Sequence, residues 1–257
     1  MNEGTPLLSI DGALATVTLR RPSQRNSLTD EDLQCLLTHV QTLQATSEVA
    51  VVLVRADTGM QAQPVFSAGY HVGGFEEDLM APLFFEKIPE AFEQLNAVTV
   101  CALNGSVYGG ATDLVLACDL RIAQAGTHWR MPACALGLHY YPSGLRRYIS
   151  RLGLAWSKRA FLLGQAMPVE ALADAALFEA VVAETDFEAT VQRCVQALLR
   201  MAPQALKDTK RSLNEIAAGL YSEPALKERA RRSVHSHDFA EGRAAFAQRR
   251  APQFTGR

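Results

Sequence analysis

Long hydrophobic runs are absent from the sequence: the longest uninterrupted apolar stretches, such as residues 49–54, are far too short to span a bilayer. A large net charge is absent as well, because the formal charge is −2 at pH 7. A near-neutral chain offers no general electrostatic attraction for nucleic acid or an acidic membrane. The first residues, 1–4, also lack the basic and then apolar pattern of a secretory signal. We therefore expect a cytoplasmic protein with no nucleic-acid and no membrane partner.

Cysteine is sparse, and its placement argues against two common uses. The five cysteines are odd in number and widely separated, which favours free thiols that act as small core residues over a disulfide framework. Cysteine and histidine never stand at zinc-like spacing, and His235 and His237 have no third ligand near them in the sequence. We expect no metal site. Hydrophobic residues are 48% of the chain and charged residues 20%, as in an ordinary globular protein.

Alternation and periodicity predict the elements of the first half of the chain. Residues 7–10 and 13–19 flank an Asp-Gly pair and predict a β-hairpin. A helix with Thr29 or Ser27 as its cap is expected next, followed by a buried strand at residues 49–54. The helix prediction rests on apolar residues at helical spacing, namely Leu33, Leu36, Leu37, Val40 and Leu43.

The same order of elements then recurs. Residues 61–74 are loop-like and residues 84–95 have helical spacing. A buried strand at 99–103, a helix after 109 and another strand at 119–123 follow. Strands followed by a helix therefore occur twice, which predicts an α/β architecture with mixed sheets.

Beyond about residue 187 the strand pattern gives way to amphipathic helices and a tail rich in Arg, Lys and Glu. Such a helical appendage either packs on a partner subunit or is a solvated terminal helix. We expect an α/β core over residues 1–190 and a C-terminal helical region over residues 191–257.

A glycine pair is the first sign of chemistry. The strand pattern ends at Asn104 and Gly105, and Gly109 and Gly110 lead into an apolar helical run that carries one acid, Asp113. A helix that starts at glycine exposes backbone N–H groups with no partner inside the helix, which suits a negative oxygen. An isolated glycine pair more often serves only a tight turn and close packing.

Four separated motifs, in order, strengthen the catalytic interpretation. They are Arg-Pro-x-x-Arg-Asn-Ser-Leu at residues 21–28, Phe-Ser-Ala-Gly-Tyr at 66–70, Asn-Gly-Ser-Val-Tyr-Gly-Gly-Ala at 104–111 with Ala-Cys-Asp at 117–119, and the pattern from Glu241 to Phe254. Together they strongly resemble the crotonase superfamily, also called the enoyl-CoA hydratase/isomerase family, and the match runs essentially from end to end.

The resemblance implies a superhelix of repeated strand-strand-helix units with a C-terminal helical region for trimerisation. It implies a homotrimer or a dimer of trimers, an acyl-CoA substrate in which coenzyme A is part of the thioester, and no prosthetic group. In that family two backbone N–H groups hold the thioester oxygen, and here they would belong to Tyr70 and Gly110. Fixed donors aimed at the oxygen stabilise an enolate more than the ground state.

Carboxylates distinguish the reactions within such a family. Hydratases of this family carry two glutamates, and the matching positions here hold Asp113 and Ala133. Loss of the second acid removes a partner needed to hold and deprotonate water, so we expect lyase or isomerase chemistry in place of simple hydration. Asp113 is a candidate acid or base because an acid in an apolar stretch suits proton transfer when buried. It can equally be a first-turn aspartate that stabilises the helix dipole.

The segment 137–144 adds two further candidates. His139 lies in the stretch that lines the acyl pocket of the family and suits proton transfer. Tyr140, with residues 106–111, looks like the methylmalonyl-CoA decarboxylase branch, where a tyrosine would hydrogen-bond a substrate carboxylate. Aromatic residues in a loop are more often pocket walls or core residues. Decarboxylation of a methylmalonyl-CoA-like thioester is therefore the alternative reaction. A third hypothesis is a weakly catalytic or non-catalytic acyl-CoA-binding protein.

Coenzyme A binding is expected at three residues. Arg25 follows the first strand pair and suits a phosphate because the guanidinium donates in pairs. The backbone around Ala68 would receive the adenine if the resemblance holds. Arg249 matches a position that reaches the nucleotide of a neighbouring subunit in relatives. For either arginine taken alone, a solvated surface position is the more common role.

Overall fold

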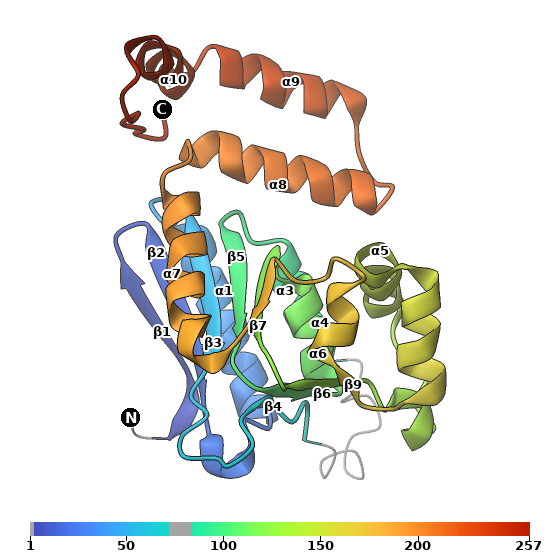
Figure 1. Ribbon diagram of the computed structural model, residues 1–257. Coiled ribbons are helices and arrows are strands. Elements are labelled where there is room, and N and C mark those ends of the chain that lie inside the picture. The colour runs from blue at the N-terminus through green and yellow to red at the C-terminus, as the bar shows by residue number, and fades with distance from the viewer. Residues whose placement is uncertain (1–2, 72–83) are drawn as a thin grey trace.

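A six-stranded sheet forms the centre of the computed structural model, which describes residues 3–71 and 84–257 (Figure 1). The first two strands form the predicted antiparallel hairpin, and each later strand pairs in parallel with its neighbour in the sheet. In spatial order the strands are β1 (Gly4–Asp11), β2 (Leu14–Arg20), β3 (Val51–Ala56), β5 (Val98–Leu103), β7 (Leu120–Gln124) and β10 (Ala180–Val182).

A smaller sheet lies beside the first and contains β4, β6, β8 and β9. Its strands are short, with bounds β4 (Val65–Ser67), β6 (Ser106–Tyr108), β8 (His128–Arg130) and β9 (Met167–Pro168). The strand β4 lies inside the segment 61–74 that was expected to be loop, and residues 72–74 of that segment lie outside the described residues. It forms because β6 offers a parallel partner, which the local sequence does not reveal.

The two sheets are linked by a repeated unit. A strand of the large sheet is followed by a strand of the small sheet and then by a helix. Among the described residues this order occurs three times, as β3, β4 and α3 (Lys87–Glu93), as β5, β6 and α4 (Gly110–Ala117), and as β7, β8 and α5 (Pro142–Lys158). The expected α/β fold of repeated strand-strand-helix units is confirmed.

Helix α1 (Asp30–Ala45) shows how local sequence sets an element. Thr29 is its N-cap, and a capping box joins it to Asp32: the Asp32 side chain accepts the Thr29 N–H at 2.9 Å while the Thr29 hydroxyl accepts the Asp32 N–H. The face with Leu33, Leu36, Val40 and Leu43 is buried in the main core. Of the two predicted caps, Thr29 is the one used.

Both faces of the large sheet are covered. Helix α7 (Glu184–Leu199) packs Phe187, Val191 and Val195 on one face, and the helices α1, α3 and α4 contribute to the core on the other. The expected division of the chain after residue 190 falls inside α7, and the chain leaves the sheet only after Leu199. The division into a core and a C-terminal region stays a prediction.

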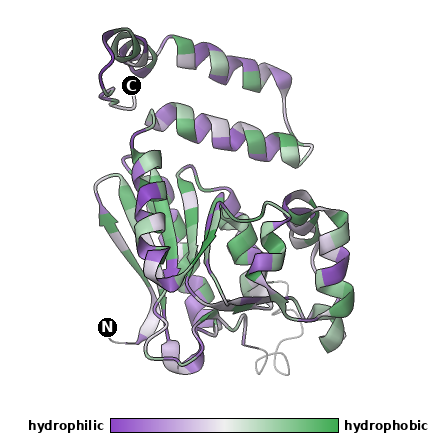
Figure 2. Ribbon diagram, in the orientation of Figure 1, coloured by the Kyte–Doolittle hydropathy of each residue, from purple (hydrophilic) through white to green (hydrophobic). Residues whose placement is uncertain are grey.

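Three helices complete the chain: α8 (Pro203–Ala217), α9 (Glu223–Val234) and α10 (His237–Gln248). They lie at one end of the molecule, with α9 running along α8 and α10 turning back beside the C-terminus (Figure 1). Apolar and polar stretches mix along all three (Figure 2). Several large apolar side chains there are exposed, among them Leu213, Ile216, Leu220, Phe239 and Phe246.

The remaining elements are short, and most of them lie between α5 and β10. Helix α5 is interrupted at Gly153, where φ is +71°. A π-helical turn (Arg159–Leu163) and α6 (Val169–Ala173) follow, and single 3₁₀ turns lie at Pro22–Gln24 and Ala133–Leu136. No helix of the described residues is long and apolar enough to cross a membrane. The five cysteines are free thiols, although Cys134 is exposed and so is not the core residue expected.

Candidate active site

A cavity of about 280 Å³ lies where the loop after β4, the start of α4 and the segment before α5 meet. Its walls are mostly apolar and aromatic, with backbone of both glycine motifs among them. The lining residues are Ser27, Ala68, Tyr70, His71, Phe85, Tyr108, Gly109, Gly110, Met131, Pro132, Ala133, Leu136, Leu138, His139, Tyr140 and Tyr141. A concave, largely apolar site with few polar groups is typical of a small-molecule pocket.

The loop after β4 is held by main-chain hydrogen bonds to the segment before α1. The Leu28 N–H donates to the Gly69 carbonyl at 2.9 Å, and the His71 N–H donates to the Leu28 carbonyl at 2.8 Å. Tyr70 therefore stands in a parallel bridge with Leu28. In such a bridge the middle residue turns its own N–H to the opposite side, so the Tyr70 N–H points away from Leu28.

The second loop ends at the start of α4. Gly109 is the residue before the helix, with φ +56° and ψ −136°, and Gly110 is the first helical residue. The N–H at this position has no acceptor inside the helix, and it lies at the positive end of the helix dipole. Glycine is needed at 109 because side chains strongly disfavour that backbone conformation.

The two loops approach each other closely. A Cβ added at Gly69, where φ is +90°, would lie 2.6 Å from the Tyr108 carbonyl oxygen and 3.4 Å from the Gly110 nitrogen. A Cβ added at Gly110 would lie 2.8 Å from the ring of Phe85. Only glycine allows this approach without displacing a neighbour, so the sequence motif at 66–70 and the glycine pair form one site.

Asp113 lies on the first turn of α4 and is fully buried. Its carboxylate receives a two-pronged ion pair from Arg147, with Nε to Oδ1 at 2.8 Å and Nη2 to Oδ2 at 2.8 Å, and the Tyr141 hydroxyl donates to Oδ2 at 2.7 Å. Asp113 is not among the cavity-lining residues. Its role as an acid or base stays a prediction, and Tyr141, which donates to it, does line the cavity.

Arg147 also holds a second acid. It donates to Glu93 at 3.1 Å, and neither Arg147 nor Asp113 is exposed to solvent. Burial alone would lower the pKa of Arg147, but the hydrogen bond and charge of Asp113, with the charge of Glu93, raise it above its ordinary value. The Arg147 guanidinium therefore stays charged beneath the cavity.

Tyr140 and Tyr141 connect this ion pair to the cavity. Their hydroxyls are 2.8 Å apart, and their rings stack with centroids 4.1 Å apart. Burial, followed by the charge of Asp113, raises the pKa of Tyr140 well above its ordinary value. Burial and the neighbouring Tyr140 do the same for the pKa of Tyr141. Both phenols therefore remain protonated at neutral pH.

The other polar candidates differ in position. His139 and His71 are exposed residues on the cavity wall. Ala133, the position that the resemblance matches to the second glutamate of hydratases, is buried on the same wall. Within residues 3–71 and 84–257, the cavity lining includes no carboxylate. The described residues also contain no group of three or more His, Cys, Asp or Glu placed to hold a metal ion.

The three residues expected to bind coenzyme A lie at different distances from the cavity. Ala68 lines the cavity, and its N–H donates to the Arg25 carbonyl at 2.8 Å. The Arg25 guanidinium is exposed and lies 5.5 Å from the centre of the Tyr108 ring, beside the cavity. Arg249 follows α10 and does not line the cavity of its own chain.

Sequence reasoning missed Phe85, Tyr108 and Arg147. Phe85 fits the periodicity of a buried helix, and nothing in that pattern marks it as a pocket wall. Tyr108 lies within the second motif but carries no distinguishing spacing. Arg147 is 34 residues from Asp113 along the chain, so no local spacing could reveal their pairing.

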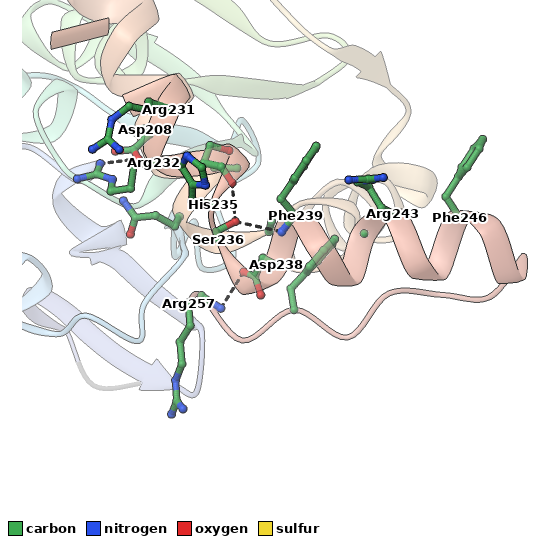
Figure 3. A pocket seen from close by; sticks show the side chains of 17 residues that line it. Asp208, Arg231, Arg232, His235, Ser236, Asp238, Phe239, Arg243, Phe246 and Arg257 are labelled. Atoms are coloured by element: carbon green, nitrogen blue, oxygen red, sulfur yellow. Dashed lines mark hydrogen bonds and ion pairs between the residues drawn. The ribbon is translucent and has the colours of Figure 1, made fainter. Parts of the chain in front are cut away.

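A larger hollow, of about 830 Å³, lies among α8, α9, α10 and the C-terminal tail. Figure 3 shows Phe239, Arg243 and Phe246 along α10, with Arg232 directed at Asp208, to which it is ion-paired at 2.7 Å. This hollow contains neither glycine loop. We therefore place the active site in the smaller cavity.

Comparison with known proteins finds relatives along the whole chain. A family model described as enoyl-CoA hydratase/isomerase matches residues 9–257. The chain is 26% identical to the probable enoyl-CoA hydratase echA8 of Mycobacterium tuberculosis, with 100% of both chains covered. It is 25% identical to the 2,3-dehydroadipyl-CoA hydratase of Escherichia coli, with 94% of both covered.

A solved structure gives the same result. An enoyl-CoA hydratase/carnithine racemase from Magnetospirillum magneticum matches with a TM-score of 0.91 and 25% identity, covering 100% of this chain and 97% of that chain. The family model spans nearly the whole sequence, and the repeated strand-strand-helix units agree with the shared fold. The chain belongs to the enoyl-CoA hydratase/isomerase family, the crotonase superfamily.

Proposed function

We propose that this enzyme binds an acyl-CoA thioester and stabilises its enolate with the backbone N–H groups of Tyr70 and Gly110. The observation that carries the proposal is the close approach of the two loops, in which a Cβ at Gly69 would lie 3.4 Å from the Gly110 nitrogen. The Gly110 N–H also lies at a helix start, where the dipole favours negative charge. Donors fixed in this way act on the charge that develops on the thioester oxygen.

For the reaction itself we favour lyase or isomerase chemistry with proton transfer at the α-carbon. His139 is the better candidate for the proton-transferring group because it lies on the cavity wall, whereas Asp113 is buried and ion-paired with Arg147. In this scheme Asp113 supports the site from beneath through Tyr141. An imidazole can both accept and donate a proton and so suits this role.

Decarboxylation of a malonyl-type thioester is the second candidate. It is favoured by the lack of a carboxylate among the described lining residues, since loss of CO₂ needs no general base in its first step. It requires the oxyanion site and a group that turns the substrate carboxylate out of the thioester plane. Tyr140 is the residue on the wall that was expected to do so.

The enolate proposal is tested by a pair of substitutions at Gly110. Proline at the first helical position removes the N–H but is tolerated there by the helix. Alanine adds the same Cβ, 2.8 Å from the Phe85 ring, but keeps the N–H. Loss of an oxyanion donor costs roughly 10²- to 10³-fold in rate, so turnover of Gly110→Pro should be lower than that of Gly110→Ala by that factor.

A panel of acyl-CoA substrates separates the reactions. Enoyl, 3-hydroxyacyl and malonyl thioesters are each incubated with the protein, and products are identified by mass spectrometry. His139→Gln should abolish proton-transfer chemistry and leave decarboxylation largely intact. Equal turnover by the Gly110→Pro and Gly110→Ala proteins would contradict the oxyanion role. Binding of CoA thioesters without turnover of any would leave a binding protein.

We propose that Arg25 and the backbone of Ala68 bind the nucleotide end of coenzyme A. Arg25 is exposed beside the cavity, and a guanidinium suits phosphate. Arg249 is proposed to act on the nucleotide held by a neighbouring subunit, because it lies outside the cavity of its own chain. Arg25→Ala should raise KM for CoA thioesters and leave kcat nearly unchanged.

We propose a homotrimer, or a dimer of trimers, assembled through α8, α9 and α10. Phe246 is 88% exposed on α10 and Leu220 is 81% exposed beyond α8, which favours burial against another copy. Light scattering after size exclusion gives the assembly mass. Phe246→Glu should reduce that mass. Met60→Glu, at a fully exposed position remote from these helices in the sequence, should not.

A further inference from the structure

In the hydrogen bonds beneath the cavity, the donor and acceptor roles are fixed by Asp113. Its two oxygens face the Nε and Nη2 of Arg147, each at 2.8 Å, in the two-pronged geometry of a guanidinium with an ionised carboxylate. An ionised carboxylate has no proton and can only accept hydrogen bonds. The contact from Tyr141 at 2.7 Å is therefore donated by the phenol.

The donor role of Tyr141 toward Asp113 in turn fixes the role of Tyr140. A phenol carries one proton, and Tyr141 uses its proton on Asp113. The Tyr141 oxygen can then only accept in its 2.8 Å contact with Tyr140. The Tyr140 hydroxyl must be the donor in that contact, and its proton is committed to the protein interior.

Packing keeps Tyr140 in this position. Its ring stacks on Tyr141 and lies against Phe161, with centroids 5.3 Å apart, and against Tyr148, at 6.4 Å. The Tyr148 hydroxyl has its own partner in Thr112, at 2.5 Å. A Cβ at Gly144 would collide with both stacked rings. The two tyrosines are therefore held as a unit.

We propose that Tyr140 presents its phenolic oxygen to the cavity as a hydrogen-bond acceptor and selects acyl groups that carry an O–H or N–H donor. An acyl chain with a hydroxyl can donate to that oxygen, whereas a carboxylate can only place lone pairs against it. Tyr140 is then a specificity-determining residue, and Tyr141, Asp113 and Arg147 are positioning residues. The inference rests on the proposed binding of acyl-CoA in this cavity.

This polarity separates the two candidate reactions. Decarboxylation would need Tyr140 to donate to a substrate carboxylate, and that requires breaking its bond to Tyr141. Binding of a hydroxyacyl group, or of a water beside an unsaturated acyl group, keeps every internal bond intact. The protein should therefore prefer a hydroxyacyl thioester to a carboxyacyl thioester of similar length.

Calorimetric titration of three thioesters tests the proposal: butyryl-CoA as the apolar reference, 3-hydroxybutyryl-CoA and malonyl-CoA. We expect wild-type protein to bind 3-hydroxybutyryl-CoA roughly 2- to 12-fold more tightly than butyryl-CoA, the range for one neutral hydrogen bond. The Tyr140→Phe protein should lose this preference for 3-hydroxybutyryl-CoA over butyryl-CoA. Tyr141→Phe frees the Tyr140 proton and should shift the preference toward malonyl-CoA, a reversal that simple loosening of the pocket would not produce.

The outcomes distinguish this inference from the proposed function. If none of the three thioesters binds, the proposed acyl-CoA function fails. If butyryl-CoA binds but the ratio to 3-hydroxybutyryl-CoA is the same in wild type and Tyr140→Phe, the acceptor role of Tyr140 is overturned and acyl-CoA binding stands. Tighter binding of malonyl-CoA to wild type than to Tyr140→Phe would likewise overturn it, because it would show Tyr140 donating.

Discussion

Arg147→Met is the most informative change to the buried network. In the wild type Arg147 donates to both oxygens of Asp113, and neither side chain is exposed. Methionine fills part of the space but leaves the Asp113 carboxylate with the Tyr141 hydroxyl as its remaining described donor. A buried charge that loses its partner costs about 3–5 kcal/mol. Glu93 also loses its ion pair with Arg147, but it keeps the one with Arg146, at 2.5 Å.

The assay is urea unfolding followed by circular dichroism and tryptophan fluorescence, with the free energy of unfolding taken by linear extrapolation. The matched control is the double variant Arg147→Met with Asp113→Leu, which removes the unpaired charge. Most of the lost stability should return in the double variant, since apolar replacement of a whole buried pair is often neutral. A loss below about 1 kcal/mol in Arg147→Met, or a double variant no more stable than the single, would refute the reasoning.

Three further predictions follow from close contacts and from pKa shifts. Gly105→Ala should lower stability by roughly 1–3 kcal/mol in thermal melts, because its Cβ would lie 2.6 Å from the backbone nitrogen of Phe66; Gly242→Ala, with its nearest contact at 3.6 Å, is the control. Burial raises the pKa of Tyr140, Tyr141 and Tyr148, so tyrosinate absorbance should show these phenols still protonated above pH 10 in folded protein. The stability that they add below pH 10 should fall as the pH rises further. Ionisation of these phenols at pH 10 without unfolding would contradict this. The Arg229 hydrogen bond lowers the pKa of Glu215 from 4.5 to about 2, so hydrogen exchange should show the contact between α8 and α9 intact above pH 4.5 and weakening toward pH 2, a dependence that Glu215→Gln should lack.

Local patterns predicted the parts of the fold that depend on neighbouring residues. Thr29 and Asp32 cap α1 through a box that spans three positions, so sequence alone could locate the helix start. The glycines at 69 and 110 were predicted from motifs, and the structure adds the reason for glycine: a Cβ at either would collide with the backbone or with Phe85. Close approach between loops is not visible in either loop by itself.

Pairings between distant residues could not be predicted. The sequence suggests Asp113 as a candidate base. Its partner Arg147 lies 34 residues away and contacts it only because α4 and α5 pack together. Likewise, apolar spacing on α8 predicted an amphipathic helix, yet Leu213 is 61% exposed. Periodicity shows that one face is apolar and does not show what covers it.

The central claim is that two backbone N–H groups hold the thioester oxygen, and vibrational spectroscopy of the bound carbonyl measures this directly. Isotope-edited infrared difference spectra of a 1-¹³C-labelled enoyl-CoA are recorded free and bound to wild type, Gly110→Ala and Gly110→Pro. Polarisation by donors at a helix start lowers the carbonyl stretching frequency, so we predict a downshift in wild type that persists in Gly110→Ala and largely disappears in Gly110→Pro. A bound carbonyl at the frequency of free substrate in wild-type protein would contradict the account.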